Sequence, residues 1–447
     1  MPVLLSHPGL CDTAHPAQCQ ERTGKAKQFR FRESPNLIPN RMNDFYSGLL
    51  FTKMTACQKL WVIPLTLLKV RMSMKLNVMF RRKTHDMKKR ASLSLLIIFS
   101  FICSSCLVGR FVWYNFSGIE DYKIFPSRPL PKSAQPFRFI EAQRTDRLGN
   151  VNLRDVDSIV QANNSVAFLI FRNDSLLFEN YYQHYNAGST VASFSMTKSY
   201  ISALVGAAIA DGYIKGVNEP ITTYLTELKG AEGFDKITIR HLLLMTSGIK
   251  ANESYYNPIG QAAKLYYGRT LRNYIKRLKT DCEPGTRFAY RSINTQLLGF
   301  IVERATGKPV TEYLNERIWS HLGTEYEANW SIDKKKNGME KSFCCINAKA
   351  RDYAKFGRLY LSNGMWEGKQ LLPSAWIQES TTPTTQDGAV TYYKYQWWLT
   401  KNGYEANGLH GEFIYVNPTK KIIIVRLGKS EGKVNWESFF DQLSETM

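Results

Sequence analysis

The sequence predicts an α+β fold, in which one antiparallel sheet combines an N-terminal and a C-terminal hairpin and a mostly helical subdomain is inserted between them. Apolar, β-branched and aromatic runs flank two turns, Asn173-Asp174 and Asn417–Lys420, which is the pattern of hairpins. The four strands are Ser165–Phe171, Leu176–Tyr182, Glu412–Val416 and Lys421–Val425. A last amphipathic helix, at about Trp436–Leu443, is expected to pack on the sheet.

Helical periodicity dominates the segment between the hairpins. The predicted helices cover an apolar run from Tyr200 to Ala210, Ile237–Leu244, about Thr295–Ala305, residues 310–322 and residues 347–361. The first of these ends at Asp211-Gly212, which is a helix-stop signal. A ligand is expected in a cleft between the sheet and this helical part.

Positive charge is concentrated near the N-terminus of the 447-residue chain, whose net charge is +21. Residues 1–110 hold 18 Lys and Arg against 5 Asp and Glu, a net of +13, which leaves 41 against 33, or +8, for the remainder. A hydrophobic content of 44% indicates a folded core. No nucleic-acid partner is expected, because a basic groove would need its charge in the globular part.

The N-terminal region is predicted to be an extension followed by a membrane segment. Residues 1–86 are basic, lack sustained periodicity and are expected to be disordered; Met87 is a candidate start, and a genuine N-terminal arm is the alternative. Within 87–110, a basic cluster precedes nineteen uncharged residues, 91–109. That length spans a bilayer core of about 30 Å as a helix.

The charge pattern around residues 91–109 places the N-terminus in the cytoplasm and the chain beyond Arg110 outside the cell membrane. A signal-anchor is the first interpretation; a cleaved signal peptide and a lipid-anchored Cys106 are the alternatives, and all three export the rest of the chain. Residues 111–139, rich in proline, are predicted to be a linker, and residues 140–447 form the globular domain.

The eight cysteines show no spacing typical of a metal site, so no metal is expected. Cys103 and Cys106 lie in the apolar segment, and Cys344 and Cys345 are adjacent. Past residue 110 three cysteines remain, so at most one disulfide forms there and one thiol is left over. Buried or idle thiols are the simplest interpretation.

A serine and a lysine three residues apart, Ser195 and Lys198, form the candidate catalytic pair. On a helix both lie on one face, and an amine of lowered pKa can activate a serine hydroxyl as a nucleophile. The Ser-x-x-Lys pattern also occurs at Ser247/Lys250, Ser331/Lys334 and Ser430/Lys433. Only Ser195 lies between a hairpin and a long apolar helix, so its context favours it over the other serines.

Four ordered stretches resemble the serine β-lactamase-related superfamily, which includes penicillin-binding proteins, esterases of β-lactamase fold and 6-aminohexanoate-dimer hydrolases. They are Ser195–Ser199 (SMTKS), Ile237–Ile249 (ITIRHLLLMTSGI), Pro284–Gly299 (PGTRFAYRSINTQLLG) and Ala406–Pro418 (ANGLHGEFIYVNP). The resemblance covers about residues 140–447 and implies a β-lactamase/transpeptidase-like fold. The SMTKS form and Phe343–Tyr360 are most similar to the aminohexanoate-dimer-hydrolase-like branch.

The resemblance implies that Ser195 is the acylated nucleophile, Lys198 its general base and Tyr290 the group that protonates the leaving group. A helix N-cap is the alternative role for Ser195. A literal Tyr-x-Asn of the family pattern occurs at Tyr255-Tyr256-Asn257, without the preceding Pro-Gly turn, and is expected to be an aromatic loop lining the mouth of the cleft.

Substrate-binding groups depart from the family pattern. Ser292 stands where Tyr-x-Asn has asparagine, and the family's Lys-Thr-Gly is replaced by a stretch that contains His410 and Gly411. His410 is either a pH-dependent donor or a residue at the start of a strand. The N–H groups of Ser195 and of one residue on this strand are expected to form an oxyanion hole. The aromatic cluster 392–398 is expected to be packing, with a substrate-lining wall as the alternative.

The expected function is that of an exported serine hydrolase that cleaves an amide or ester through an acyl-enzyme on Ser195. Small linear substrates fit better than penicillins, because both recognition motifs are altered, and no metal or organic cofactor is implied. The alternatives are a penicillin-binding protein, DD-peptidase or β-lactamase, and an inactive anchored binding protein of the same fold. The sequence leaves the oligomeric state open.

Overall fold

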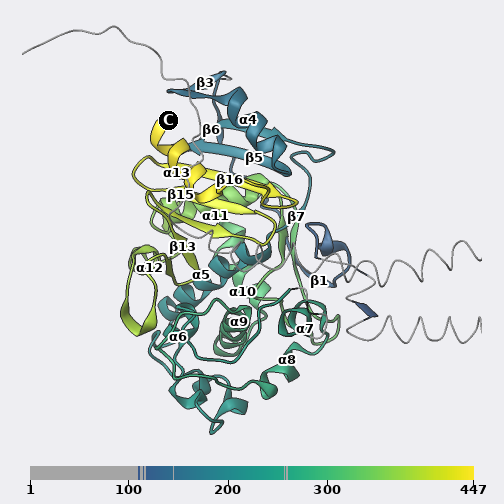
Figure 1. Cartoon of the computed structure of the whole chain (residues 1–447), viewed down its shortest axis with the longest axis vertical. Helices are drawn as coiled ribbons and strands as arrows, with labels where there is room; N and C mark the ends of the chain where they lie inside the picture. Colours follow the sequence, from purple (N-terminus) through teal and green to yellow (C-terminus); the bar gives the residue numbers. More distant parts are fainter. Residues whose placement is uncertain (1–108, 111–113, 115–116, 144, 256, 258–259) are drawn as a thin grey trace, which may run out of the picture. The chain divides into compact units, whose positions relative to one another are not determined.

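The structure of the protein, a computed structural model, describes residues 109–110, 114, 117–143, 145–255, 257 and 260–447. Its largest element is an eight-stranded sheet (Figure 1). In spatial order the strands are β12 (Tyr393–Lys394), β13 (Trp397–Leu399), β14 (Tyr404–Asn407), β15 (Phe413–Asn417), β16 (Ile422–Gly428), β5 (Ser165–Arg172), β6 (Ser175–Tyr181) and β2 (Ile140–Glu141).

The two predicted hairpins, β5–β6 and β15–β16, lie side by side in this sheet. Strand β16 pairs antiparallel with β5, with Ile424 opposite Ile170, so the two ends of the domain meet at the centre of the sheet. Every pair in the sheet is antiparallel except β2–β6, which is parallel. The α+β prediction is confirmed.

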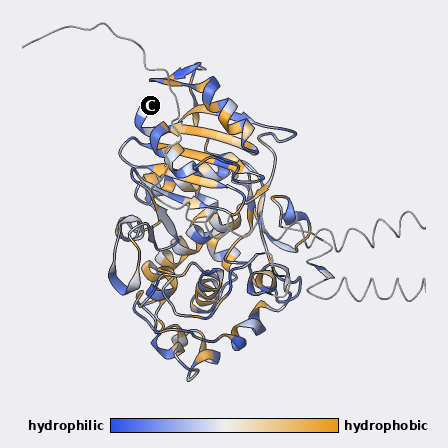
Figure 2. Cartoon of the chain, in the orientation of Figure 1, coloured by the Kyte–Doolittle hydropathy of each residue, from blue (hydrophilic) through white to orange (hydrophobic). Residues whose placement is uncertain are grey.

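Helices cover both faces of the sheet, which explains why its central strands are apolar throughout rather than alternating (Figure 2). Helix α11 (Ala350–Leu361) packs on one face, where Gly357 lets it approach the side chain of Ile414. Helix α13 (Trp436–Thr446) packs on the other face, where Phe440 contacts Phe413. Helix α4 (Leu153–Ala162) also packs on β5.

The helical part between the hairpins surrounds α5 (Thr197–Ala210), which is buried from Thr197 to Ala208. Helices α9 (Ser292–Thr306) and α10 (Val310–Arg317) pack against it. The other α-helices of the described residues are α6 (Ile239–Leu243), α7 (Gln261–Tyr267), α8 (Leu271–Tyr274) and α12 (Ser374–Thr381). Short 3-10 helices are η1 (Asp121–Lys123), η2 (Phe194–Met196), η3 (Ile221–Thr223), η4 (Thr226–Leu228), η5 (Phe234–Lys236), η6 (Ile275–Arg277), η7 (Trp319–His321) and η8 (Gln386–Gly388).

A second, four-stranded sheet was not predicted. Its order is β1 (Ser127–Leu130), β8 (Ala328–Ser331), β9 (Ile346–Ala348) and β7 (Val191–Ala192). Strand β9 occupies the start of the segment predicted as helix 347–361, so α11 begins only at Ala350. Two small hairpins complete the strands: β3 (Arg147–Leu148) with β4 (Val151–Asn152), and β10 (Met365–Trp366) with β11 (Lys369–Gln370).

The predicted linker 111–139 differs from the structure where the structure describes it. Strand β1 pairs with β8, and Ile119, Phe125 and Leu130 are buried in the core. These apolar side chains anchor the segment to the domain, so it is not a free connector.

The predicted extension 1–86 and membrane segment 91–109 lie outside the described residues, except for Gly109. Within the ranges that the structure describes, no helix is both long and apolar enough to cross a membrane.

Candidate active site

Ser195 lies in a short, strained turn between β7 and α5. Phe194, the residue before it, has φ of +42°, a left-handed conformation that costs a bulky residue about 1–3 kcal/mol. Contacts to β9 hold this turn: Ser193 N–H donates to the carbonyl of Ile346 (2.8 Å), and Ile346 N–H donates to the hydroxyl of Thr197 (3.1 Å). The hydroxyls of Ser193 and Thr197 are hydrogen-bonded at 2.6 Å.

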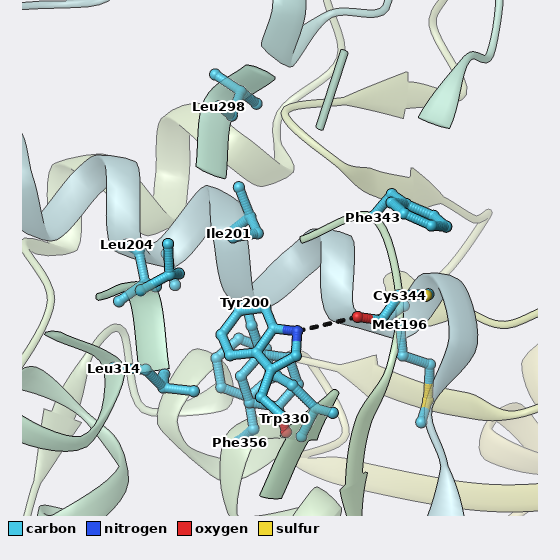
Figure 3. Packing of buried hydrophobic residues seen from close by; sticks show 14 of the residues in the cluster. Met196, Tyr200, Ile201, Leu204, Leu298, Leu314, Trp330, Phe343, Cys344 and Phe356 are labelled. Atoms are coloured by element: carbon cyan, nitrogen blue, oxygen red, sulfur yellow. Dashed lines mark hydrogen bonds between the residues drawn. The ribbon is translucent and has the colours of Figure 1, made fainter. Parts of the chain in front are cut away.

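A dense apolar core packs around Met196 and the start of α5, next to the turn (Figure 3). Tyr200 of α5 stacks on Phe356 of α11 with ring centroids 3.7 Å apart. Trp330 of β8 lies beside them and donates from its indole nitrogen to the carbonyl oxygen of Cys344 at 3.0 Å. The start of α5 is therefore fixed by packing as well as by hydrogen bonds.

Lys198 is buried directly beside the candidate nucleophile, with 1% of its surface exposed. Its Nζ donates to Ser195 Oγ (2.9 Å), Ser292 Oγ (3.2 Å) and the carbonyl oxygen of Phe343 (2.8 Å). Burial lowers the pKa of Lys198 from 10.5 to about 7, and the negative charge of Glu253 opposes this shift.

The three partners of Lys198 suit a change in its protonation state. The ammonium form has three N–H groups and three acceptors. The neutral amine can keep two N–H bonds, to Ser292 and Phe343, while its lone pair faces the hydroxyl of Ser195. In that form the lysine can accept the serine proton, which is the role of a general base.

The other three Ser-x-x-Lys pairs lack this arrangement. Lys250 and Lys433 are exposed, and Lys334 is half-buried. Ser247 instead bonds to Asn294 at 2.6 Å. The N-cap alternative for Ser195 is also not found, since Met196 is the N-cap residue of α5.

Tyr290 lies beside this pair, in the segment that precedes α9. Its ring centroid is 5.1 Å from Lys198 Nζ. Burial raises the pKa of the phenol well above 10, and a hydrogen bond with the hydroxyl of Ser195 opposes the rise. A phenol that stays protonated at neutral pH can donate a proton. The structure thus brings together Ser195, Lys198, Tyr290 and Ser292.

The aromatic cluster 392–398 divides between the site and the core. Tyr393 and Trp398 pack on Tyr290, with ring centroids 5.9 and 5.4 Å away. Trp397 instead packs on Tyr360 of α11, inside the core. Packing therefore explains both groups of aromatic residues, and Tyr393 and Trp398 also fix the ring of Tyr290.

The loop that follows α6 supplies a carboxylate to the site. Glu253 Oε2 accepts from the N–H of Ser292 (3.0 Å), and Glu253 Oε1 accepts from the hydroxyl of Tyr255 (2.8 Å). The Tyr-x-Asn match at Tyr255 thus belongs to a loop beside the site and serves to hold Glu253.

The segment Gly408–Gly411 runs close to the nucleophile turn. A Cβ added to Gly408 would lie 2.7 Å from the carbonyl oxygen of Ser193, so only glycine fits there. Three of its four N–H groups have acceptors: Gly408 to the Glu412 carbonyl (2.7 Å), His410 to Glu412 Oε2 (3.0 Å) and Gly411 to the Gly408 carbonyl (3.1 Å). In the described structure, the N–H of Leu409 has no such partner.

His410 and Gly411 face groups other than Lys198. The His410 ring packs edge-on against Phe194, with centroids 4.7 Å apart, and its Nε2 lies 3.4 Å from the hydroxyl of Ser117. Burial lowers the pKa of His410 from 6.5 to about 4, so the ring is neutral at pH 7. The carbonyl of Gly411 accepts from the guanidinium of Arg426.

The expectation of idle thiols was wrong for two of the three cysteines past residue 110. Cys344 and Cys345 form a disulfide between adjacent residues, and Cys282 is a free thiol. In the part of the chain that the structure covers, no cluster of three or more His, Cys, Asp or Glu side chains could hold a metal ion.

A family profile described as Beta-lactamase matches residues 154–436, which include every side chain placed at the site. The chain belongs to the beta-lactamase family. The resemblance seen in the sequence is therefore confirmed, and the protein is a beta-lactamase-family serine hydrolase.

Relatives of this beta-lactamase-family hydrolase share most of its domain. The 6-aminohexanoate-dimer hydrolase of Paenarthrobacter ureafaciens is 28% identical over 308 residues, covering 64% of this chain and 77% of that protein. A Bacillus anthracis structure, proposed to be a 6-aminohexanoate-dimer hydrolase, has a TM-score of 0.64 at 25% identity and covers 73% of this chain and 91% of its own. A penicillin-binding protein from Bacillus halodurans (TM-score 0.53, 16% identity, 65% and 98% covered) shares the fold.

Three groups at the site of this hydrolase were missed in the sequence. The Phe343 carbonyl and the Leu409 N–H are main-chain groups, so no residue type marks them. Glu253 lies in a loop with no motif of its own, two residues before Tyr255. The one available signal was the aromatic Tyr255-Tyr256 run, which was interpreted only as a loop near the site.

Proposed function

We propose that this hydrolase cleaves an amide or ester bond through an acyl-enzyme on Ser195. The carrying observation is the buried contact of 2.9 Å between Lys198 Nζ and Ser195 Oγ. Because burial brings the pKa of Lys198 to about 7, about half of the lysine is neutral, and able to accept a proton, at neutral pH.

In the proposed reaction, Ser195 Oγ attacks the substrate carbonyl carbon and its proton passes to Lys198. The carbonyl oxygen becomes an oxyanion, and Tyr290 donates its proton to the leaving nitrogen or oxygen as the bond to carbon breaks. Lys198 then returns a proton to Tyr290. Water attacks the acyl-enzyme by the same route and releases the acid with free Ser195.

The oxyanion is proposed to be bound by the N–H groups of Ser195 and Leu409. Both N–H groups are without an acceptor among the residues that the structure describes, and Gly408 brings the second one next to the nucleophile turn. Gly411, predicted as a substrate-binding residue, uses its N–H within the turn. We therefore assign the second N–H of the oxyanion hole to Leu409.

The substrate is proposed to be a small linear amide or ester. His410 is neutral at pH 7 and so provides no cation for a penicillin carboxylate. Ser292 presents a hydroxyl, which is shorter than the family's amide and is shared with Lys198. The Paenarthrobacter ureafaciens relative is named as a hydrolase of a 6-aminohexanoate dimer. Export across the membrane through residues 91–109 belongs to the same proposal and is supported by the charge pattern of the sequence.

Covalent labelling tests the proposal. Full-length protein is incubated with a fluorophosphonate probe and with a fluorescent penicillin, beside Ser195→Ala and Ser430→Ala; Ser430 belongs to another Ser-x-x-Lys pair and serves as the matched control. We expect fluorophosphonate to label wild type and Ser430→Ala but not Ser195→Ala. Penicillin labelling of Ser195 would favour a penicillin-binding protein or β-lactamase, and a folded protein that neither probe labels would contradict the enzyme proposal.

A further inference from the structure

Glu253 contacts the site without belonging to the Ser195–Lys198–Tyr290 set. Its Oε2 accepts from the N–H of Ser292, the first residue of α9, at 3.0 Å. A carboxylate is favourable at a helix N-terminus, where backbone N–H groups lack intrahelical partners. The same residue, Ser292, presents its hydroxyl to Lys198 Nζ at 3.2 Å. Glu253 therefore fixes a residue that in turn contacts the lysine.

The negative charge of Glu253 also acts on the lysine. Its charge raises the pKa of Lys198 against the larger effect of burial, which lowers it. It raises the pKa of Tyr290 as well. Its field thus reaches both proton-transfer groups of the site.

The elements packed on α5 bring few other titratable groups toward Lys198. The segment before α9 brings Tyr290, α9 brings the neutral Ser292, and η2 brings Ser195. Charged residues of the other packed elements have partners elsewhere: Arg317 and Glu316 of α10 pair with Asp211 and Lys308, and Glu405 of β14 accepts from Asn407.

We propose that Glu253 is a positioning residue for Lys198: its carboxylate holds Ser292 against the lysine and supplies the counter-charge for the ammonium formed when Ser195 gives up its proton. This inference rests on the proposed acyl-transfer function. The proton transfer creates a cation in a site that is almost fully buried, and an unpaired buried charge is costly. A nearby carboxylate stabilises the product of that transfer, and the transition state with it.

Glu253 is not assigned contact with substrate. One oxygen is engaged by Ser292 and the other by the hydroxyl of Tyr255 at 2.8 Å. The lysine and the tyrosine suffice to move the protons. The role of Glu253 is therefore exerted through Lys198 and Ser292.

The test is the pH dependence of fluorophosphonate labelling in Glu253→Gln. Glutamine keeps an amide oxygen that can accept from Ser292 N–H but removes the charge. The rate in wild type should fall on acidification as Lys198 gains a proton. In Glu253→Gln the midpoint of this fall should move to lower pH by roughly 0.5–1 unit, because the ammonium is less stable, and the plateau rate should fall about tenfold.

Tyr255→Phe is the matched control, because it removes the other hydrogen bond to Glu253 and leaves the charge. Its midpoint should equal that of wild type. A lower plateau in Glu253→Gln with an unchanged midpoint would show a merely structural role and overturn the inference. If Glu253→Gln does not fold, Glu253→Asp replaces it. The shorter side chain of aspartate draws the charge back from Lys198, so the midpoint of labelling should move to lower pH by a smaller amount. A midpoint at or above the wild-type value would overturn the inference. Wild type that does not label at all would instead refute the acyl-transfer function.

Discussion

Lys198 should make the stability of this hydrolase depend on pH in a way that Lys198→Met abolishes. Burial holds the pKa of the folded-state lysine near 7, whereas an unfolded lysine has a pKa of about 10.4. Between these two values the unfolded chain binds more protons than the folded chain. The free energy of unfolding contributed by this group therefore rises with pH across that window.

The size of the effect follows from the two pKa values. Below pH 7 the buried lysine costs the fold roughly 4–5 kcal/mol relative to a lysine with an unshifted pKa. Between about pH 6 and about pH 9 the cost falls by roughly 3 kcal/mol, or two powers of ten in the unfolding equilibrium. Methionine does not titrate, so the stability of Lys198→Met carries no such pH-dependent cost. The variant also leaves the carbonyl of Phe343 without its donor, but it does so at every pH.

Urea unfolding of wild type and Lys198→Met, followed by tryptophan fluorescence at the two pH values, measures this difference. From the lower to the higher pH, the free energy of unfolding of wild type should rise by roughly 3 kcal/mol relative to that of Lys198→Met. Lys433→Met, at an exposed lysine of another Ser-x-x-Lys pair, should show no such gain. A Lys198→Met difference that stays constant within about 0.5 kcal/mol would refute the assigned burial of a titrating lysine.

Three further predictions concern activity and packing. Fluorophosphonate labelling of wild type should rise with pH through a midpoint near 7, because neutral Lys198 is the reactive form; a rate that does not change between about pH 5 and pH 9 would contradict this role. Gln396→Ala should lower the free energy of unfolding by about 2–4 kcal/mol, since this buried side chain bonds to Thr295 and to two carbonyls of α6; urea unfolding measures the loss. Gly206→Ala should reduce the melting temperature measured by calorimetry, because its Cβ would lie 2.4 Å from the ring of Trp376.

Elements with a local signal were predicted from the sequence. The two hairpins were found because their turns and apolar runs are contiguous, and α5 because its apolar residues end at Asp211-Gly212. The four-stranded sheet was not found. Its strand β1 pairs Ser127 with Ser331, about two hundred residues away, and β9 has only three residues. Such short, distant pairings leave no periodicity to detect.

The candidate site likewise combines residues that a sequence pattern marks with contacts that only the folded chain creates. Ser195, Lys198 and Tyr290 were selected by spacing and resemblance, and the structure brings them together. The position of Lys198 at the start of an apolar helix already indicates burial, and so a neutral lysine that can act as a base, and the structure shows it buried. Its contact with the carbonyl of Phe343 could not be predicted. Sequence does not encode main-chain acceptors as residue types. The left-handed φ of Phe194 likewise results from the surrounding contacts.

The two departures from the penicillin-handling pattern act on different properties of the site, its charge and the reach of its hydrogen-bond donors. The stretch that corresponds to the family's third motif has no Lys-Thr-Gly, and burial keeps its His410 neutral at pH 7. At position 292 the family's asparagine is replaced by a serine that accepts a hydrogen bond from Lys198 and has one hydroxyl hydrogen left to donate. Neither residue offers positive charge to an acyl group, while Glu253 adds a negative charge nearby. A carboxylate next to the scissile bond is therefore disfavoured, and a neutral acyl group should react faster than its carboxylate-bearing analogue.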